Sequence, residues 1–491
     1  MNFKPTLEEA REIAGNGEYK VIPVSCEIYS DSCTPIELLK KLKKISKHCY
    51  MLESVEDTQK WGRYTFLGFN PTLELTCTNG ALQINSGTTF TVQTDRPGDY
   101  IKNIIDENKS PKMDYLPSFT GGLVGYFSYD YIKYAEPSLT LDARDEENFK
   151  DVDLMLFDKV IAFDHFKQKI ILIANAKLVE LETEYNRAVM ELKNLMQLIQ
   201  SGEAMLTPKP VLKSELKPLF TKEEFCQMVE RAKHYIKEGD IFQVVLSNRL
   251  EAEFEGSLLD VYRVLRTTNP SPYMFFFSSD DIEIAGASPE TLVKLENGIL
   301  NTFPLAGSRP RGKTEEEDLQ LERELLADQK ELAEHNMLVD LGRNDVGKIS
   351  KFGSVKVNQY LSVERFSHVM HIGSTIEGEI QEDKSAIDAV DAILPAGTLS
   401  GAPKIRACEI INELENNKRG IYGGAIGYID FTGNLDTCIA IRLAFKKNGK
   451  IFIRSGAGIV ADSIPESEHQ ECLNKAQAVI HAIGIAREGL E

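Results

Sequence analysis

The order of strand-like and helix-like segments predicts a mixed α+β fold with largely antiparallel sheets. Short runs rich in β-branched and aromatic residues alternate with acidic, helix-like stretches, and the alternation is not a regular βαβ repeat. The chain has 491 residues, enough for two or three domains of common size. Hydrophobic residues make up 42% and charged residues 27%, as in an ordinary globular protein.

In the first 200 residues, three runs have the composition of strands, and one longer segment has helical spacing. The strand-like runs are 81–85, 89–93 and 169–176. Residues 178–200 carry apolar side chains at helical spacing. Residues 201–218 lose this periodicity and contain three prolines, which predicts a linker. We therefore divide the chain into an N-terminal region, 1–205, and a C-terminal domain, 219–487.

A helix and a strand are expected directly after the linker. Thr221 and Glu224 have the spacing of a capping box, so a helix is expected to begin here, and Gly239 is expected to end it. Residues 241–250 follow as a strand. Further strand-like runs occupy 272–277, 291–295, 425–431, 438–445 and 450–457.

The overall charge and the cysteine pattern argue against several classes of protein. The formal net charge of −19 argues against a nucleic-acid-binding surface. No apolar run reaches the roughly 20 residues that cross a membrane, and the N-terminus lacks the apolar core of a signal peptide. None of the eight cysteines forms a CxxC pair. We therefore expect a cytoplasmic protein with reduced thiols that binds neither nucleic acid nor membranes.

Two pairs of glutamates at helical spacing suggest a site for a hard cation. Glu331 and Glu334 are three residues apart, so on a helix their carboxylates share one face. Glu468 and Glu471 repeat this spacing, and Lys475 lies one turn further along the same face. Brought together, the four carboxylates would suit Mg²⁺, which prefers oxygen ligands. Each pair by itself is more typical of a solvated helix face than of a metal site.

Two glycine-rich segments match nucleotide-binding motifs but lack the surroundings that such motifs need. Residues 307–314 fit GxxxxGK[ST], but the acidic run 315–318 follows at the helix start and would repel a triphosphate. Pro310 also lacks the N–H that such a loop uses. Residues 456–461 fit GxGxxA, but a turn-forming run with Pro465 follows before any long helix. A nucleotide site is therefore not expected.

Ordered segments along nearly the whole chain resemble a known family. They are LES (52–54), GGLVGYFSYD (121–130), GDIFQVVLSNR (239–249), NPSPYMFF (269–276), GASPE (286–290), PLAGSRPRG (304–312), EHNMLVDLGRNDVG (334–347), VMHIGS (369–374), LPAGTLSGAPKIRA (394–407), GIYGGAIGYID (420–430), AIR (440–442), RSGAGIVADS (454–463) and PESEHQECLNKA (465–476). In this order they resemble the large subunits of anthranilate synthase, which are chorismate-utilising enzymes. The resemblance implies antiparallel sheets that form a sandwich flanked by helices, with an N-terminal α/β subdomain.

The resemblance implies a reaction that converts chorismate and ammonia to anthranilate and pyruvate. Ammonia adds to C2 as the C4 hydroxyl leaves, and this poor leaving group needs a proton donor. The family pattern gives that role to Glu290 in GASPE and assigns His371 in VMHIGS to the loss of pyruvate. Without the resemblance, Glu290 would be an ordinary capping or surface carboxylate and His371 a core histidine.

The resemblance also implies a Mg²⁺ site and a set of substrate contacts. Glu334 and Glu471 would bind the metal directly, and Glu331 and Glu468 would act mostly through waters. Arg442 would hold the enolpyruvyl carboxylate with its fork of donors. The full set of implied substrate contacts is Ala306, Gly307, Thr398, Tyr422, Arg442, Gly456, Gly458 and Lys475.

The residues at two positions indicate which of the related enzymes' reactions to expect for this chain. Relatives that add water carry a lysine base where this chain has Gln243, and a glutamine cannot take a proton from water. Aminodeoxychorismate synthases usually carry a nucleophilic lysine where this chain has Ala306. Both substitutions favour direct attack by ammonia, with aminodeoxychorismate synthase component I as the alternative.

A feedback site for tryptophan is a further implication of the resemblance. It would be built from Glu53, Ser54, Asn269, Pro272, Tyr273 and Met274. Glu53 could pair with the ammonium of the ligand, and Tyr273 and Met274 could contact an indole. The alternative is that these residues only form a helix end and a turn before a strand.

The ammonia source is expected to be a separate subunit. The sequence contains no GxCxG nucleophile elbow for glutamine hydrolysis, so a glutamine amidotransferase subunit is the expected partner, in a hetero-oligomer such as a heterotetramer. The rival of another class is a tryptophan-sensing regulatory protein without catalytic activity. The presence of all four glutamates and His371 argues against that rival.

Overall fold

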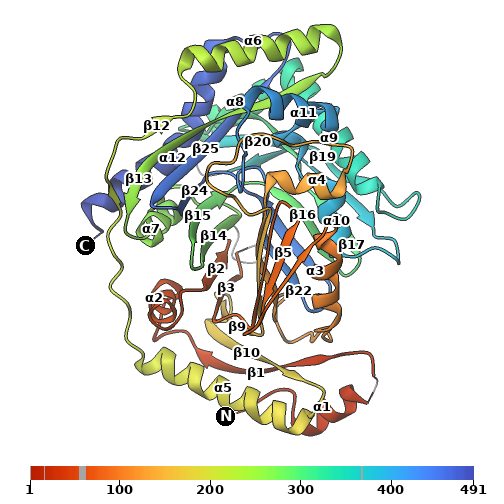
Figure 1. Cartoon of the computed structure of the whole chain (residues 1–491), viewed down its shortest axis with the longest axis vertical. Helices are drawn as coiled ribbons and strands as arrows, with labels where there is room; N and C mark the ends of the chain where they lie inside the picture. The colour runs from red at the N-terminus through yellow and green to blue at the C-terminus, as the bar shows by residue number, and fades with distance from the viewer. Residues whose placement is uncertain (1, 16, 55–61, 367–368, 491) are drawn as a thin grey trace.

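The computed structural model describes residues 2–15, 17–54, 62–366 and 369–490. Within these residues, two large sheets pack face to face, and neighbouring strands of each sheet run antiparallel (Figure 1). Helices cover the outer faces. This arrangement confirms the predicted α+β fold, in which antiparallel sheets form a sandwich flanked by helices.

The two sheets draw strands from the whole length of the chain. The first contains, in spatial order, β1 (Val21–Tyr29), β10 (Lys169–Lys177), β9 (Lys159–Asp164), β3 (Tyr64–Phe69), β2 (Cys49–Glu53), β14 (Tyr273–Ser278), β15 (Ile282–Ser288), β24 (Leu443–Lys447), β25 (Lys450–Ile459), β13 (Gln243–Glu255) and β11 (Val211–Leu212), with β12 (Lys217–Pro218) and β21 (Gly401–Ala402) also paired to β13. The second contains β18 (Leu305–Pro310), β20 (Val369–Glu379), β17 (Ile299–Thr302), β16 (Thr291–Glu296), β23 (Leu435–Ile439), β22 (Ala425–Asp430), β7 (Gly122–Phe127), β8 (Val152–Phe157), β4 (Leu73–Thr78), β5 (Ala81–Asn85) and β6 (Thr89–Gln93), with β19 (Lys356–Arg365) paired to β20.

The helices lie outside the two sheets. They are α1 (Leu7–Ala14), α2 (Pro35–Ile45), α3 (Pro97–Asp106), α4 (Ile132–Ala135), α5 (Leu181–Ser201), α6 (Lys222–Glu238), α7 (Leu259–Thr268), α8 (Glu315–Ala327), α9 (Gln329–Gly347), α10 (Ala386–Ile393), α11 (Lys404–Glu415) and α12 (Pro465–Glu488), with short 3₁₀ helices η1 (Tyr129–Tyr131) and η2 (Gly397–Leu399). In the first sheet α2, α5, α7 and α12 pack on the strands, and in the second α9 and α10 do so. None of the helices in the described part of the chain is long and apolar enough to cross a membrane.

Aromatic side chains fill the core between the sheets. Tyr50 on β2 in the first sheet meets Phe157 on β8 in the second, with ring centroids 4.7 Å apart. Phe275 and Phe445 add further buried rings from the first sheet. Burial of such rings is the main source of stability for a sandwich of this kind, because each removes a large apolar area from water.

The N-terminal and C-terminal regions share both sheets. β2 pairs with β14 in the first sheet, and β7 pairs with β22 in the second. The strands of the N-terminal region are therefore continuous with those of the C-terminal domain. The domain boundaries at 1–205 and 219–487 stay a prediction, and the segment between them contains only the short strands β11 and β12 after α5 ends.

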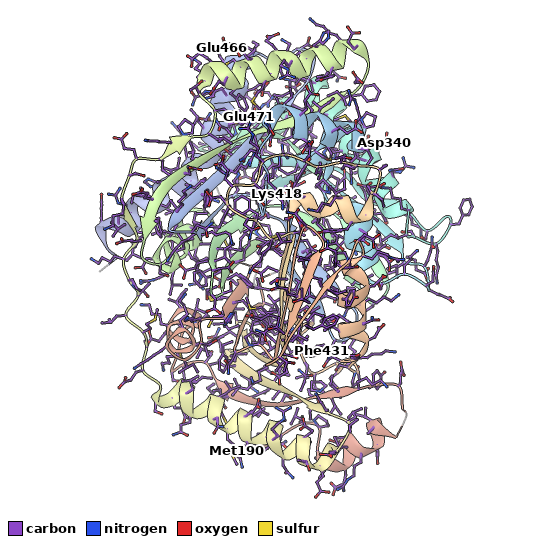
Figure 2. The ribbon with its side chains drawn as sticks, viewed as in Figure 1. Met190, Asp340, Lys418, Phe431, Glu466 and Glu471 are labelled. Carbon is purple, nitrogen blue, oxygen red and sulfur yellow. The ribbon has the colours of Figure 1, made fainter. Side chains whose placement is uncertain are left out.

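Most of the elements predicted from spacing are present. The predicted strands appear as β5, β6, β10, β13, β14, β16, β22 and β25, and the predicted helix after residue 178 is α5. Thr221 and Glu224 form the capping box of α6, and Gly239 ends that helix with a φ of 86°. The hydrophobic stripe of α5 faces the first sheet, while Met190 on its other face is exposed (Figure 2).

The prediction of one continuous strand at 438–445 is wrong. The chain leaves β23 at Ile439 and enters β24 of the other sheet at Leu443. Arg442, in the connection, has a φ of 54°, in the left-handed region that extended strands cannot use. Composition alone could not reveal this break, because the residues on both sides of it favour strands.

Candidate active site

The two predicted site residues Glu290 and Arg442 lie where the chain crosses between the sheets. Glu290 is in the connection from β15 to β16, and Arg442 is in the return connection from β23 to β24. The Ile439 N–H donates to the Glu290 carbonyl at 2.9 Å. The Ala287 N–H donates to the Arg442 carbonyl at 3.1 Å. These hydrogen bonds hold the two connections together, so residues 152 positions apart become neighbours.

Glu290 has the properties of a proton donor. Its side chain is buried, with Thr398 Oγ1 donating a hydrogen bond to Oε1 at 3.1 Å. Burial raises the pKa of Glu290 to about 8, against the opposing effects of the Thr398 hydroxyl and the Lys475 ammonium. The carboxyl is therefore mostly protonated at neutral pH, as a general acid requires. This geometry also places Thr398, a predicted substrate contact, directly at Glu290.

Arg442 and Tyr422 lie together on the same side of the site. Burial lowers the pKa of Arg442, and the nearby Tyr422 and Glu471 oppose that shift. The Nη1 of Arg442 donates to the Lys475 carbonyl at 3.3 Å. Tyr422 is 3% exposed, and burial raises the pKa of its hydroxyl. A partly desolvated guanidinium beside a neutral phenol is suited to bind a carboxylate.

His371 is held as a neutral imidazole. Its Nδ1 lies 2.8 Å from the Gly307 carbonyl oxygen and 3.0 Å from Ser308 Oγ. A carbonyl can only accept, so Nδ1 carries the hydrogen and Nε2 is left as an acceptor. Burial lowers the pKa of His371, and the cations of Arg442 and Lys475 lower it further, although the Gly307 contact raises it.

A bulge in β18 brings Gly307 into the site. The pairing register with β20 shifts between Ala306 and Ser308, and Gly307 has a φ of 67°. A Cβ at this position would lie 3.1 Å from Glu331 Oε2. Glycine therefore allows both the left-handed backbone and the close approach of the glutamate.

Gln243 joins the metal-binding candidates to the substrate-binding candidates. It is 3% exposed, and its Nε2 donates to Glu334 Oε1 at 3.3 Å. Its Oε1 is buried without a hydrogen-bond partner among the described residues. A Cβ on Gly458 would lie 2.5 Å from Gln243 Nε2, so glycine at 458 makes room for this amide.

The glutamate pairs lie at the starts of α9 and α12, as the spacing predicts. Burial raises the pKa of Glu331 and of Glu468, and the second glutamate of each pair, Glu334 or Glu471, adds to the effect. No three His, Cys, Asp or Glu side chains in the described ranges are grouped closely enough to hold a metal ion alone. The oxygen donors therefore fit Mg²⁺ only if waters and substrate oxygens complete the coordination shell.

Lys475 connects α12 to β25. Its Nζ lies 2.6 Å from Glu471 Oε1 and donates to the Gly456 carbonyl at 3.1 Å. A Cβ on Gly456 would lie 2.9 Å from the Tyr422 hydroxyl. Gly456 thus lies between the lysine and the tyrosine, and Figure 2 shows Glu471 on α12 in the upper part of the sandwich.

The structure provides no phosphate cradle at the two glycine-rich motifs. The N–H groups of Gly312 and Lys313 donate to the carboxylates of Asp318 and Glu317, each at 2.7 Å. These donors are therefore not free for phosphate. Residues 456–459 belong to β25 and do not form the loop that a dinucleotide site needs.

A separate cavity of about 610 Å³ contains most of the residues predicted for the tryptophan site. Glu53, Ser54, Pro272, Tyr273 and Met274 line it. They meet because β2 pairs with β14, which places Glu53 opposite Met274. Asn269 is not among the lining residues and caps the C-terminal end of α7.

The Glu53 carboxylate already has strong partners. Arg266 donates to it from Nε at 2.6 Å and from Nη2 at 3.1 Å, and the Tyr262 hydroxyl donates at 2.5 Å. Glu53 therefore holds the wall of the cavity in place. Asp436 also lines the cavity and accepts a hydrogen bond from the Tyr273 hydroxyl at 2.8 Å. Asp436 lies outside the segments that resemble the family, so no motif pointed to it.

A buried cluster of charged side chains lies next to the site, and no sequence pattern pointed to it. Glu415, Arg419 and Arg454 are each at most 4% exposed, and Glu415 pairs with both arginines. Arg419 directly precedes one of the family-like segments. No spacing rule predicted that these three charges would be buried together.

The chain is similar throughout its length to known enzymes. Residues 47–481 match the model of the chorismate binding enzyme family. Anthranilate synthase component 1 of Acetivibrio thermocellus is 48% identical over 99% of both chains. The protein of the same name from Aquifex aeolicus is 44% identical over the full length of both.

Solved structures agree with these matches. Anthranilate synthase component I of Streptococcus pneumoniae superposes with a TM-score of 0.75 at 40% identity, covering 92% of this chain and 98% of that one. The isochorismate synthase MenF of Escherichia coli has the same fold, with a TM-score of 0.70 at 18% identity, covering 97% and 98% of the two chains. The chain therefore belongs to the chorismate-binding enzyme family, within the group of anthranilate synthase component 1.

Proposed function

We propose that this chain converts chorismate and ammonia to anthranilate and pyruvate, as the catalytic large subunit of an anthranilate synthase. The observation that carries the proposal is the buried Glu290, whose carboxyl accepts a hydrogen bond from Thr398 in a chain related to anthranilate synthase over its full length. The residues around Glu290 match the needs of each chemical step.

The first step needs a proton at the leaving C4 hydroxyl. Glu290 donates it, because its carboxyl is protonated at neutral pH. Ammonia forms the new bond at C2 with its own lone pair, so no strong base is needed there. Gln243 provides a neutral amide at the position where water-adding relatives use a lysine.

The second step eliminates pyruvate and makes the ring aromatic. The ring proton at C2 must leave together with the enolpyruvyl group. His371 is neutral and has Nε2 available as an acceptor, so it assists this loss. Arg442 and Tyr422 hold the enolpyruvyl carboxylate in place.

Mg²⁺ would be held by Glu334 and Glu471, with Glu331 and Glu468 acting mainly through waters. When bound, the ion neutralises the ring carboxylate and orients the substrate. Raised pKa values at Glu331 and Glu468 support this assignment, because buried carboxylates near one another favour a cation. Lys475 supplies further positive charge next to Glu471.

The rival reaction, aminodeoxychorismate synthesis, is less well supported. It would use a lysine nucleophile at position 306, where this chain has alanine in β18. An alanine cannot form the covalent bond that this chemistry requires.

Tryptophan is proposed as the inhibitor, and a glutamine amidotransferase subunit as the ammonia source. The cavity lined by residues of β2 and β14 supports the first, because its lining combines Tyr273 and Met274 with polar side chains that can bind an amino acid. The name component 1 of the relatives supports the second, since it implies a further component.

The direct test is an assay for anthranilate fluorescence. The purified chain is incubated with chorismate, ammonium and Mg²⁺, and the product is identified by chromatography. We expect anthranilate and an equal amount of pyruvate. Formation of aminodeoxychorismate or isochorismate, or no reaction at any ammonium concentration, would refute the proposal.

A further inference from the structure

The guanidinium of Arg419 lies in the interior directly behind the candidate active site. The residue is 2% exposed and follows α11. Its Nη1 donates to the Leu399 carbonyl at 2.6 Å, and its Nη2 donates to the Val245 carbonyl at 2.7 Å. One side chain therefore ties η2 to β13, two segments that are far apart in the sequence.

Both of these segments carry site residues. Leu399 ends η2 and directly follows Thr398, whose hydroxyl donates to Glu290. Val245 lies two residues after Gln243 on β13. The backbone adds a second link, because the Val245 N–H donates to the Ser400 carbonyl at 2.9 Å.

Glu415 holds the guanidinium in a fixed orientation. Its two oxygens accept from Arg419 Nη2 at 2.5 Å and Nε at 2.9 Å. Ser247 donates to the same carboxylate from its backbone N–H at 2.8 Å and from its hydroxyl at 3.0 Å. Arg454 completes the cluster with a hydrogen bond from Nη2 at 2.7 Å.

Two aromatic rings enclose the guanidinium. The Tyr129 ring lies 4.5 Å from its central carbon, and the Tyr422 ring, which belongs to the substrate-binding candidates, lies 5.8 Å away. Arginine meets all these partners at once because its donors form a planar fork, whereas lysine offers only a compact charge.

We infer that Arg419 is a positioning residue for the reaction: it fixes η2 and β13 from behind, and so sets the hydrogen bond that Thr398 gives to Glu290. Arg419 does not touch the substrate in this arrangement. Its effect reaches the reaction through Thr398, which makes a contact that favours the charged form of the Glu290 carboxylate. The inference rests on the proposed function only for its kinetic readout.

The first test measures structure and needs no activity. Amide hydrogen exchange is compared in the wild-type protein, in R419K and in R249K. Arg249 is a matched control, since it is a buried arginine on β13 that pairs with Glu251 and, among the described residues, donates no side-chain hydrogen bond to η2. We expect faster exchange at Ser400, Val245 and their neighbours in R419K only. Equal exchange in R419K and the wild type overturns the inference.

The second test follows the pH dependence of kcat/KM for chorismate with ammonium as nucleophile. Activity needs protonated Glu290, so it falls as pH rises past the pKa of this group. Two charged groups lie around Glu290, and neither is changed in R419K. Lys475 on α12 lowers the pKa of Glu290 through its charge, and Asp345 on α9 lines a small cavity together with Glu290 and Thr398. Loss of the Thr398 hydrogen bond raises the pKa of Glu290, so R419K should move the alkaline limb upward by about 0.5–1 pH unit.

A double-mutant comparison separates positioning from general damage. T398V should move the same limb in the same direction, and R419K should add no further shift in the T398V background. The inference is overturned if R419K is slower but the alkaline limb of its pH profile does not move. It is also overturned if the shifts of R419K and T398V add in the double variant. If R419K does not fold, S247A replaces it, since it removes a hydroxyl from the Glu415 contacts and no charge. An unmoved limb in S247A then overturns the inference, while an inactive wild-type chain refutes the proposed function instead.

Discussion

At the scale of single residues, the properties of Glu290 come from its surroundings. An exposed glutamate has a pKa near 4.3 and cannot donate a proton at neutral pH. Burial in the connection between the sheets raises the pKa of Glu290 to about 8. The sequence motif therefore identifies the residue, but its burial in the fold raises its pKa toward the range that the reaction needs.

Replacement of Glu290 by glutamine should remove the proton donor and keep the shape of the site. We expect kcat to fall by about 10²- to 10⁴-fold, with little change in the binding of chorismate. In the wild-type enzyme, kcat/KM should fall as pH rises past about 8, because Glu290 then loses its proton. Steady-state assays across pH check both points. A glutamine variant that keeps more than a tenth of the activity would contradict this role.

We expect Gln243 to determine which nucleophile reacts. A lysine at this position would place an amine beside Glu334, which now accepts from the amide at 3.3 Å. We expect Gln243→Lys to weaken anthranilate formation and to admit a product of water addition. Gln243→Met, of similar length but without an amine, is the control and should lose anthranilate without gaining the new product. Chromatography that finds the same product at the same rate in Gln243→Lys rules out this role.

At the scale of elements, helix α12 presents glutamates with different surroundings. Glu471 pairs with Lys475 and lies near Arg442, whereas Glu466 lies close enough to Cys226 on α6 to affect that thiol (Figure 2). The two carboxylates are on one helix and are both exposed. A comparison of variants at the two positions therefore separates an effect on the proposed metal site from a general effect on the helix.

Glu471→Gln should raise the Mg²⁺ concentration needed for half-maximal activity by about 10- to 100-fold. Glu466→Gln, the matched control, should leave it unchanged. The Glu471–Lys475 pair is exposed, so its loss should change the free energy of unfolding by no more than about 0.5 kcal/mol. Magnesium titrations of activity and urea unfolding measure these two effects. Equal responses from both variants would remove Glu471 from the proposed metal site.

The pairing of β2 with β14 builds the wall of the large cavity. A phenylalanine at Ser54 would project into the space that an indole needs. We expect Ser54→Phe to lose inhibition by millimolar tryptophan while it keeps its activity. The assay compares inhibition curves of the variant and the wild type. A wild-type enzyme that does not respond to tryptophan would refute the regulatory proposal itself.

At the scale of the whole molecule, the two sheets bring distant segments to one place. Glu290 and Arg442 occupy the connections between the sheets, while the glutamate pairs lie on α9, which packs on β18 and β20 of the second sheet, and on α12, which packs on β25 of the first. The seven buried cysteines and the half-buried Cys226 lie in no recognisable hydrolytic site in the described part of the chain. Burial raises the pKa of Cys26, Cys49 and Cys472, which are therefore unreactive thiols.

The whole chain should therefore use ammonium and fail to use glutamine. We expect anthranilate from chorismate, Mg²⁺ and ammonium, and none when glutamine replaces ammonium. Addition of a glutamine amidotransferase subunit should restore activity with glutamine. Both assays use the same fluorescence signal. Activity with glutamine from this chain alone would contradict the prediction of a separate partner.

The sequence determined the local features of this protein. Capping residues placed the start of α6, apolar spacing placed α5, and glutamates three residues apart fixed carboxylates on one helix face. These features depend on neighbours within a few positions, so they can be predicted from the chain alone. The ordered motifs also identified the family and supplied the residues that are predicted for the site.

Only the tertiary structure decided which of these features meet. The turn at Arg442 depends on a break between two strands. Three other features depend on contacts between residues more than 100 positions apart: the burial of Glu290, the partners of Glu53 and the Arg419 cluster. Such contacts set the pKa values and the geometry of the site, because desolvation and hydrogen bonding act through space and not along the chain. Spacing could therefore predict carboxylates on one face, but only the packing of the two sheets buries Glu290 and raises its pKa, as the proposed reaction requires.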